Sequence, residues 1–176
     1  MNPVRKFGLE LQRFPLPSPT ASRELFLGLA EAARPSDIHE ELAVFDSELR
    51  LHQASLQLEQ LGEPFGRIEL LQLEEVGLQR GEAFHDYAIV TRNGRIYLDC
   101  CLSALFSLHT AKPGAESGPA LLQLEEHLIA RTSCNGLPLY AIDRQLADLA
   151  ERIARAYGCG VEWHEPERFA SATASP

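Results

Sequence analysis

Apolar residues recur at the three- and four-residue spacing of an amphipathic helix in the first third of the chain. This pattern predicts a helix over residues 21–33. It predicts a second helix over about 37–49, where Ser36 stands in a favourable N-cap position. Over residues 50–61 the pattern fits a continuing helix or a strand. We therefore expect helices at the start of the fold.

The same periodicity is strongest near the C-terminus, where it predicts a helix over residues 143–157. Gly158 follows this segment, in the position where a glycine ends many helices. A shorter apolar pattern favours another helix over 120–130, and the residues at 161–163 favour a short strand. The long C-terminal pattern consists of Ile142, Leu146, Leu149, Ile153 and Tyr157.

Residues 86–99 show a different pattern, in which β-branched and aromatic residues flank the dipeptide Asn93-Gly94. Asn-Gly is the preferred two-residue turn of a β-hairpin, because both turn positions need a positive φ. We therefore predict a hairpin of two antiparallel strands. A two-residue turn at this dipeptide places Ala88 opposite Asp99.

Together these elements predict an α+β protein with a central antiparallel sheet and helices packed on one face. The sheet contains the 86–99 hairpin. Residues 1–20 end in a proline-rich run and are expected to form an extended leader. Residues 21–168 are expected to form a single domain, and residues 169–176 a small, polar, flexible tail.

The composition supports a folded chain and narrows the class of partner. Hydrophobic residues make up 45% of the 176 residues and charged residues 23%, which is ordinary for a globular domain. The formal net charge is -9, and an acidic surface repels phosphate groups. We therefore expect neither nucleic acid nor an anionic membrane as a partner, and favour a protein partner with a basic surface.

The chain has no apolar run near the roughly 20 residues that a membrane helix needs. Its first residues do not follow the pattern of a secretory signal. Cys100 and Cys101 are adjacent, which does not suit a framework of disulfides. We expect free thiols in a bacterial cytoplasm, and delivery into another cell by a machine that reads no N-terminal signal is compatible with this.

Two residues that bracket the hairpin are candidates for catalysis. His85 precedes the first strand, and Asp99 ends the second. A bend in the hairpin would let the carboxylate reach the imidazole. An aspartate in that position fixes the tautomer of a histidine base and stabilises its protonated form.

A His at the head of a strand, an Asn-Gly turn and an aromatic-apolar-Asp ending resemble the His–Asp half of papain-like and transglutaminase-like thiol enzymes. The pattern is especially similar to the papain-fold deamidase and protease toxins of bacteria, over residues 84–99. The resemblance implies a cysteine at a helix N-terminus that attacks an amide or thioester. It also implies that His85 is the base of that cysteine and that Asp99 orients the imidazole.

The chain departs from the usual Cys-His-Asp order of these families, because no cysteine precedes His85. The chain is then a degenerate member without a nucleophile, a circularly permuted member like the lecithin–retinol acyltransferase-like branch, or a chance likeness. A permuted site makes Cys134 the candidate nucleophile. Cys134 lies a few residues before the predicted 143–157 helix, whose N-terminus would acidify a thiol. The alternative for Cys134 is a small buried apolar side chain.

Other motifs of bound chemistry are missing from the sequence. There is no Walker A segment, no G-x-G-x-x-G and no pair of cysteines separated by two residues. We therefore predict no cofactor and no metal site. The segment Leu-Gln-Leu-Glu starts at residues 56, 71 and 122, and this unequal spacing favours coincidence over an old duplication.

Two classes of function follow, and the sequence leaves both open. The favoured class is a non-catalytic protein-interaction module of immunity, chaperone or adaptor type, which a degenerate papain-like fold would also fit. The alternative is a papain-like or transglutaminase-like thiol enzyme, a hydrolase, deamidase or acyltransferase that is circularly permuted. An enzyme needs a thiol within reach of His85 inside a pocket, whereas a binding module needs an exposed surface with apolar residues.

Overall fold

The computed structural model of the chain describes residues 2–12 and 19–169. It is an α+β fold, as the sequence predicted, and its strands form two antiparallel sheets where one was expected. One of the sheets is curled into a half-barrel. Most of the proline-rich part of the expected leader lies outside the described residues, and so does the expected tail from residue 170 onward.

Residues 4–99 contain all six strands of one sheet, which has two helices on one of its faces. Its elements are β1 (Val4–Leu11), α1 (Pro19–Leu27), a 3-10 turn (Glu31–Ala33), β2 (Asp37–His39), β3 (Leu42–Phe45), α2 (Glu48–Leu61), β4 (Phe65–Leu73), α3 (Phe84–Tyr87), β6 (Ala88–Val90) and β7 (Ile96–Asp99). The strands lie in the order β2-β3-β1-β4-β7-β6, and every neighbouring pair is antiparallel.

The residues after Asp99, together with the short segment Gln79–Arg80, form a five-stranded antiparallel sheet in the order β11-β8-β10-β9-β5. Its elements are β5 (Gln79–Arg80), β8 (Ser103–Thr110), α4 (Ser117–Leu124), β9 (Leu128–Cys134), β10 (Leu137–Asp143), α5 (Ala147–Ala156) and β11 (Cys159–His164), with 3-10 turns at Glu125–His127, Arg144–Leu146 and η4 (Pro166–Phe169). None of the helices in the described part of the chain is long and apolar enough to cross a membrane.

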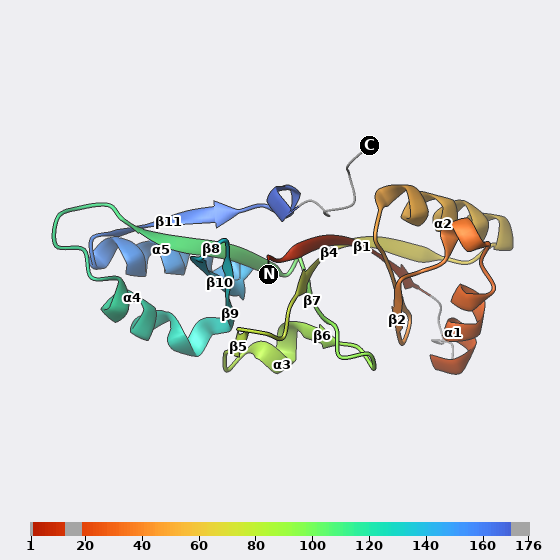
Figure 1. Cartoon of the computed structure of the whole chain (residues 1–176), viewed down its shortest axis with the longest axis horizontal. Coiled ribbons are helices and arrows are strands. Elements are labelled where there is room, and N and C mark those ends of the chain that lie inside the picture. The colour runs from red at the N-terminus through yellow and green to blue at the C-terminus, as the bar shows by residue number, and fades with distance from the viewer. Residues whose placement is uncertain (1, 13–18, 170–176) are drawn as a thin grey trace.

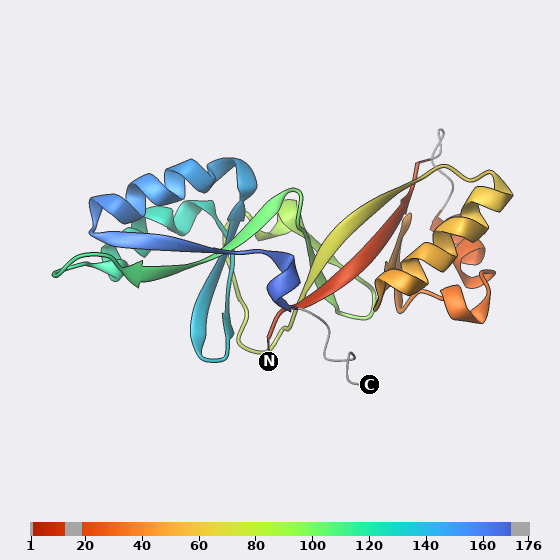
Figure 2. The same cartoon turned by 90° about the horizontal axis from the view of Figure 1, so that it is seen from above.

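The two sheets repeat one connectivity. The segments β1-α1-β2-β3-α2-β4 and β8-α4-β9-β10-α5-β11 have the same order of elements, and each sheet places its second, third, first and fourth strands side by side in that order. This is the connectivity of the split βαβ, or ferredoxin-like, unit. We term the two segments the N-terminal unit and the C-terminal unit. Their helices lie at opposite ends of an elongated molecule, with α3 and the β6–β7 hairpin between them (Figures 1 and 2).

The Leu-Gln-Leu-Glu segments do not follow this repeat. They lie in α2, in β4 and in α4. In the repeated connectivity α2 corresponds to α5, and α4 corresponds to α1. The three segments therefore occupy unrelated places, and the repeat in structure does not explain them.

Of the larger clusters of buried apolar side chains, two lie within one unit each and a third joins the two units. One lies between the N-terminal sheet and helices α1 and α2, and one between the C-terminal sheet and helices α4 and α5. The third joins the helix-free face of the C-terminal sheet to β4 and β7, with Phe84 and Phe169 at its sides. Each fully buried Leu or Phe contributes about 1.5–3 kcal/mol, so this central core couples the units strongly.

Part of the expected N-terminal leader is a central strand. Residues 4–11 form β1, which pairs with β3 on one side and with β4 on the other. Leu9 and Leu11 are buried, while Glu10 between them is exposed. This alternation of buried and exposed residues is typical of a strand. The segment was assigned to the leader because prolines follow it. The fold therefore begins well before the expected boundary at residue 21.

The predicted helix over 37–49 is wrong. This segment forms the hairpin β2–β3, with Glu40 in its turn at a φ of +50°. All four residues of β3 are buried, Ala43 and Phe45 against the helices and the other two on the concave face, where the sheet curls on itself. Such a continuous apolar run mimics a helical stripe. The helix begins at α2, where the Ser47 side chain caps it by accepting from the N–H of Arg50 at 3.4 Å. Residues 50–61 are helical.

The hairpin at 86–99 is present, but its loop is one residue longer than predicted. The N–H of Thr91 donates to the carbonyl of Arg95 at 2.9 Å, which leaves three residues in the loop. Gly94 has a φ of +74°, whereas Asn93 does not have a positive φ. Three-residue loops of this kind need only one left-handed residue.

The longer loop changes the pairing that follows. Ala88 lies opposite Leu98 rather than Asp99. His85 is not on the strand at all, since residues 84–87 form the short helix α3. A shift by one residue exchanges the two faces of a strand, so the predicted alignment of His85 with Asp99 does not hold.

Candidate functional site

The helix-free face of the N-terminal sheet is concave. Strand pairing places a small apolar cluster on this face, consisting of Leu42, Val44, Leu70 and Tyr97. Gly8 lies on the same face of β1, and a Cβ atom there would come within 2.5 Å of the Ile68 side chain. Because Gly8 has no side chain, Ile68 can lie across β1 and the sheet can curl.

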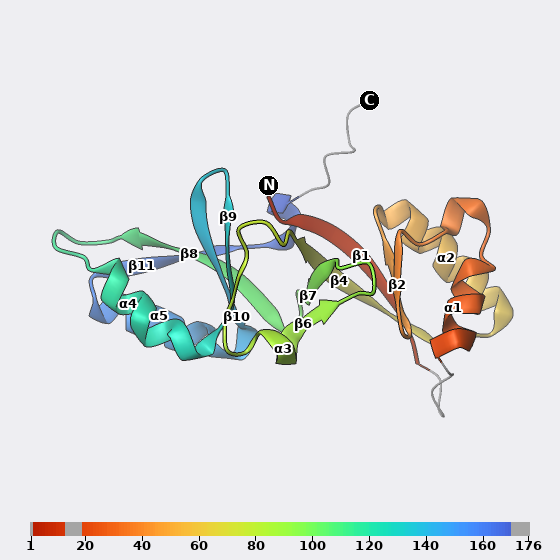
Figure 3. The same ribbon diagram turned by 60° about the horizontal axis from the view of Figure 1, so that its bottom comes forward.

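A buried carboxylate closes one end of the curled sheet. The Asp37 side chain is fully buried and accepts hydrogen bonds from the Thr91 hydroxyl at 2.8 Å and the Tyr97 hydroxyl at 3.2 Å. Its other oxygen accepts from the Asn93 amide at 2.9 Å. Burial and the Asp37 carboxylate raise the pKa of Tyr97, so this hydroxyl stays protonated. The bonds from Thr91 and Asn93 tie β2 to the tip of the β6–β7 hairpin, and the ribbons of these two segments lie close together in Figure 3.

The opposite end of the half-barrel is open and forms a pocket of about 320 Å3, which we term the acidic pocket. Its apolar walls are Leu42, Ile68, Tyr87, Ile89 and Leu102. Its carboxylates are Glu10, Glu40, Glu41, Asp86 and Asp99, with His39 beside them. Apolar walls with a polar rim are typical of sites that bind a ligand or a partner side chain.

The five carboxylates have no cationic partner within the described part of the chain, where none of the ion pairs involves them. Like charges that share one rim repel each other, and a cation that enters the rim relieves this repulsion. The acidic pocket therefore favours a positively charged guest.

Two hydrogen bonds fix the walls of the acidic pocket. The Tyr87 hydroxyl donates to the Asp143 carboxylate at 2.5 Å, and this bond, together with burial, raises the pKa of Tyr87. Asp143 ends β10, so the contact links the pocket to the C-terminal unit. Asp99 accepts from the N–H of Cys101 at 2.7 Å, which orients its carboxylate.

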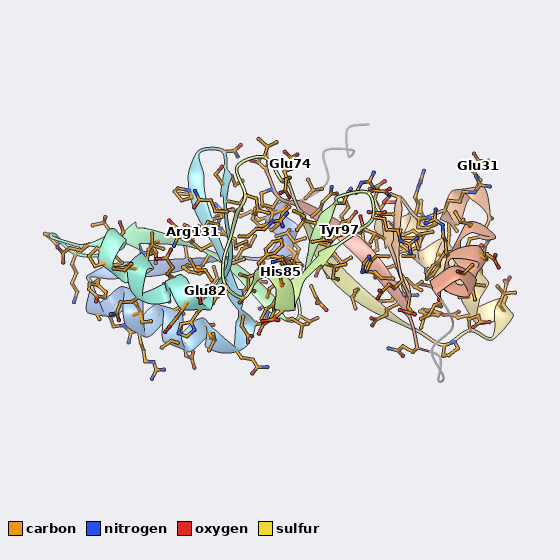
Figure 4. All side chains as sticks on the ribbon, turned by 90° about the horizontal axis from the view of Figure 1, so that it is seen from below. Glu31, Glu74, Glu82, His85, Tyr97 and Arg131 are labelled. Carbon is orange, nitrogen blue, oxygen red and sulfur yellow. The ribbon has the colours of Figure 1, made fainter. Side chains whose placement is uncertain are left out.

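The structure separates the three residues predicted for catalysis. His85 is exposed on α3, with its ring edge-on to Phe84 at 5.6 Å between centroids (Figure 4). Asp99 lines the acidic pocket, and Cys134 lines a different pocket. Neither His85 nor Cys134 is among the residues that line the acidic pocket. Of the three, Asp99 alone belongs to the candidate site.

Cys134 does not precede a helix. It ends β9 and is followed by Asn135 and Gly136 in a tight turn, both with positive φ of 51° and 81°. The strand Leu137–Asp143 then separates it from α5, so Cys134 does not lie at the N-terminus of that helix. The one histidine among the residues that line the same pocket is His164.

Both ring nitrogens of His164 already have partners. Nδ1 accepts from the Arg168 guanidinium at 2.7 Å, since an arginine can only donate. Nε2 therefore carries the proton and donates to the Ser107 hydroxyl at 2.9 Å. Burial and the Arg168 charge lower the pKa of His164, so the ring is neutral at neutral pH. His164 has no free nitrogen to take a proton from Cys134 in this arrangement.

The other cysteines offer no reactive pair. Cys100 is buried, and burial together with the nearby Glu69 and Asp99 charges raises the pKa of its thiol to about 12. A thiol with such a pKa is a poor nucleophile. Cys101 is exposed at the β7–β8 turn. Among the described residues, no three His, Cys, Asp or Glu side chains are placed to hold a metal ion.

No protein-family model, curated protein or solved structure matches this chain.

Sequence reasoning missed most of the acidic pocket. Glu10 belongs to a strand that was assigned to the leader, and Glu40 and Glu41 to a helix that does not form. The alternation of residues 7–11 was the one signal that could have placed Glu10 on a sheet face. Nothing in the sequence indicates that Asp86 approaches these glutamates.

Proposed function

We propose that this protein is a non-catalytic protein-interaction module that binds a basic segment of a partner in the acidic pocket. The observation that carries the proposal is the group of five carboxylates that line the acidic pocket together with apolar side chains, in the open end of the half-barrel. The formal net charge of -9 adds a field that would speed the approach of a basic partner.

The chemistry of the walls favours the insertion of a long basic side chain. Lysine and arginine bury an apolar stem and keep a charged head in polar surroundings. The stem would contact Ile68 and Ile89, and the head would reach the carboxylates of Glu10 and Glu41. A cavity of about 320 Å3 has room for such a side chain and an apolar neighbour.

A binding role also agrees with what lines the pocket. Its lining includes neither cysteine nor serine, so no thiol or serine hydroxyl stands beside His39 as a nucleophile. We place the protein in the cytoplasm, as a partner of the chaperone, immunity or adaptor kind.

A peptide-binding experiment tests this proposal. The probe is a fluorescent peptide in which arginine and lysine alternate with leucine, matched by a peptide with glutamine at the basic positions. Removing three rim charges, in Glu10→Gln/Glu41→Gln/Asp86→Asn, should weaken binding of the basic peptide about tenfold, because each rim charge contributes roughly 0.5 kcal/mol. The readout is fluorescence anisotropy at two salt concentrations.

The matched control removes the same number of charges outside the pocket, in Glu31→Gln/Glu59→Gln/Glu165→Gln, at three exposed positions. It should leave the affinity nearly unchanged. Equal losses in both triple variants would mean that only the overall charge matters. Equal binding of the glutamine peptide would likewise contradict the proposal.

A further inference from the structure

A second pocket, of about 300 Å3, lies where the start of β1, the β9–β10 turn and η4 meet. We term it the Arg168 pocket. It is lined by Asn2, Pro3, Cys134, Asn135, Leu137, Leu139, His164, Arg168 and Phe169. Asn2 and Asn135 fix one side of its rim by a reciprocal pair of hydrogen bonds, at 3.1 and 3.0 Å.

The charge of this pocket is opposite to that of the acidic pocket. Arg168 is the one lining residue with a full charge, because His164 is neutral when the guanidinium donates to its Nδ1. No carboxylate lines the pocket. The Glu162 carboxylate pairs with this guanidinium from outside the lining. In a chain with a formal net charge of -9, a cavity lined by an arginine and by no carboxylate is still a local exception that favours an anion.

Two contacts hold the Arg168 side chain in place and leave some of its N–H donors unused. A single nitrogen, Nη1, serves both His164 Nδ1 at 2.7 Å and the Glu162 carboxylate at 2.8 Å. The hydrogen bonds between described residues use neither Nε nor Nη2 of Arg168. Adjacent donors of a guanidinium match the two oxygens of a carboxylate in a bidentate pair.

The remaining walls suit the other half of such a ligand. Leu137, Leu139 and Phe169 give the pocket an apolar side, and the Cys134 thiol lies in the same lining. We propose that the Arg168 pocket binds a small organic acid, whose carboxylate pairs with Arg168 and whose apolar group packs on Phe169, next to Cys134. This site is independent of the acidic pocket and of its peptide guest.

Competitive alkylation of Cys134 tests the assignment. Iodoacetate and iodoacetamide react alike: the sulfur forms a bond to the CH2 carbon, iodide leaves, and the thiol proton goes to solvent. They differ in that iodoacetate carries a carboxylate. Pairing with Arg168 should raise the ratio of the iodoacetate rate to the iodoacetamide rate at Cys134 about fivefold above that of Arg168→Gln, as expected for one partly exposed ion pair.

Peptide mapping by mass spectrometry gives the rates at each cysteine of the intact protein, and the exposed Cys101 serves as an internal reference. Arg155→Gln is the matched control, because it removes one exposed positive charge from α5. It should leave the ratio at Cys134 unchanged. Glu162→Gln should raise the ratio, since it frees Nη1 from its carboxylate.

A protection experiment on the unmodified protein tests the proposal even if Arg168→Gln perturbs the fold. Phenylacetate should protect Cys134 of the unmodified protein from iodoacetamide, and the neutral phenylacetamide should not. Equal protection by both compounds, or by neither, would overturn the proposal. So would a ratio at Cys134 that is the same in Arg168→Gln and Arg155→Gln.

Discussion

The two units have the same connectivity, but the helix-free face is covered in the C-terminal unit and partly open in the N-terminal unit. In the C-terminal unit this face is covered, because β4, β7 and α3 pack against it to form the central core. In the N-terminal unit the same face curls on itself, is closed at one end by Asp37, and stays open at the other. We infer from this difference that the candidate site arises where the repeated fold leaves a sheet face without a covering layer.

Truncating one side chain on each face gives the largest contrast. Ile129 on the covered face is fully buried, and Leu42 on the open face is 5% exposed and lines the acidic pocket. We expect Ile129→Ala to lower the free energy of unfolding by about 4 kcal/mol and Leu42→Ala by about 2 kcal/mol, since water already reaches the second site. Urea unfolding followed by circular dichroism measures both, and equal losses would contradict the contrast.

Removing the carboxylate that closes the half-barrel should have the next largest effect. Asp37→Ala leaves the hydroxyls of Thr91 and Tyr97 without their acceptor, and we expect a loss of about 3 kcal/mol in urea unfolding. Asp46→Ala is the matched control, because Asp46 pairs with Lys6 in the same unit but is partly exposed. It should cost less than about 1 kcal/mol. A loss no larger than this control would mean that Asp37 does not close the sheet.

The smallest expected effect is a pH dependence of stability that arises in the C-terminal unit, at His164. The folded pKa of His164 lies below its ordinary value of 6.5, so below that pH the unfolded chain binds more protons than the folded one. The contribution of His164 is therefore fully present above pH 6.5 and is lost as the pH falls toward the lowered pKa. Melting temperature should fall less between pH 7 and pH 5.5 in His164→Gln than in the unmodified protein. Parallel curves would show that His164 does not contribute.

Two Asn-Gly dipeptides show how far local sequence determines local structure. Asn135-Gly136 forms a turn with two positive φ angles, in which Cys134 pairs with Leu137. Asn93-Gly94 was predicted to form that turn but has a three-residue loop instead. The Asn93 amide bonds to Asp37, which lies 56 residues away in the chain. This tertiary contact accompanies a loop that the dipeptide alone did not predict.

Elements with a clear period of apolar residues could be predicted from the sequence, and buried strands without one could not. Residues 143–157 are close to α5, because a helix with one buried face carries a clear period. The β2–β3 hairpin was missed, because Leu42–Phe45 is buried on both faces and has no period of two. Buried strands of this kind are recognised only when the covering layers are known.

The candidate site was less accessible to sequence reasoning than the fold. Its carboxylates come from four separate segments of chain, and curling of the sheet brings them to one rim. Asp99 was predicted as a functional residue, but as a partner of His85, from which the hairpin register separates it. The acidic composition predicted a negatively charged binding surface, but it could not predict which residues form that surface.

The position of β1 has a consequence for the synthesis of the chain. This strand leaves the ribosome before β3 and β4, the two neighbours that enclose it in the sheet. Until β3 has emerged, both edges of β1 lack their partners, and one edge stays unpaired until β4 follows. An unpaired apolar strand is prone to associate with other chains. Arg5 and Lys6 put two positive charges on this strand, and Gly8 weakens its intrinsic tendency to pair. The nascent strand is thus kept apart from other chains by charges that later form ion pairs with Glu69 and Asp46.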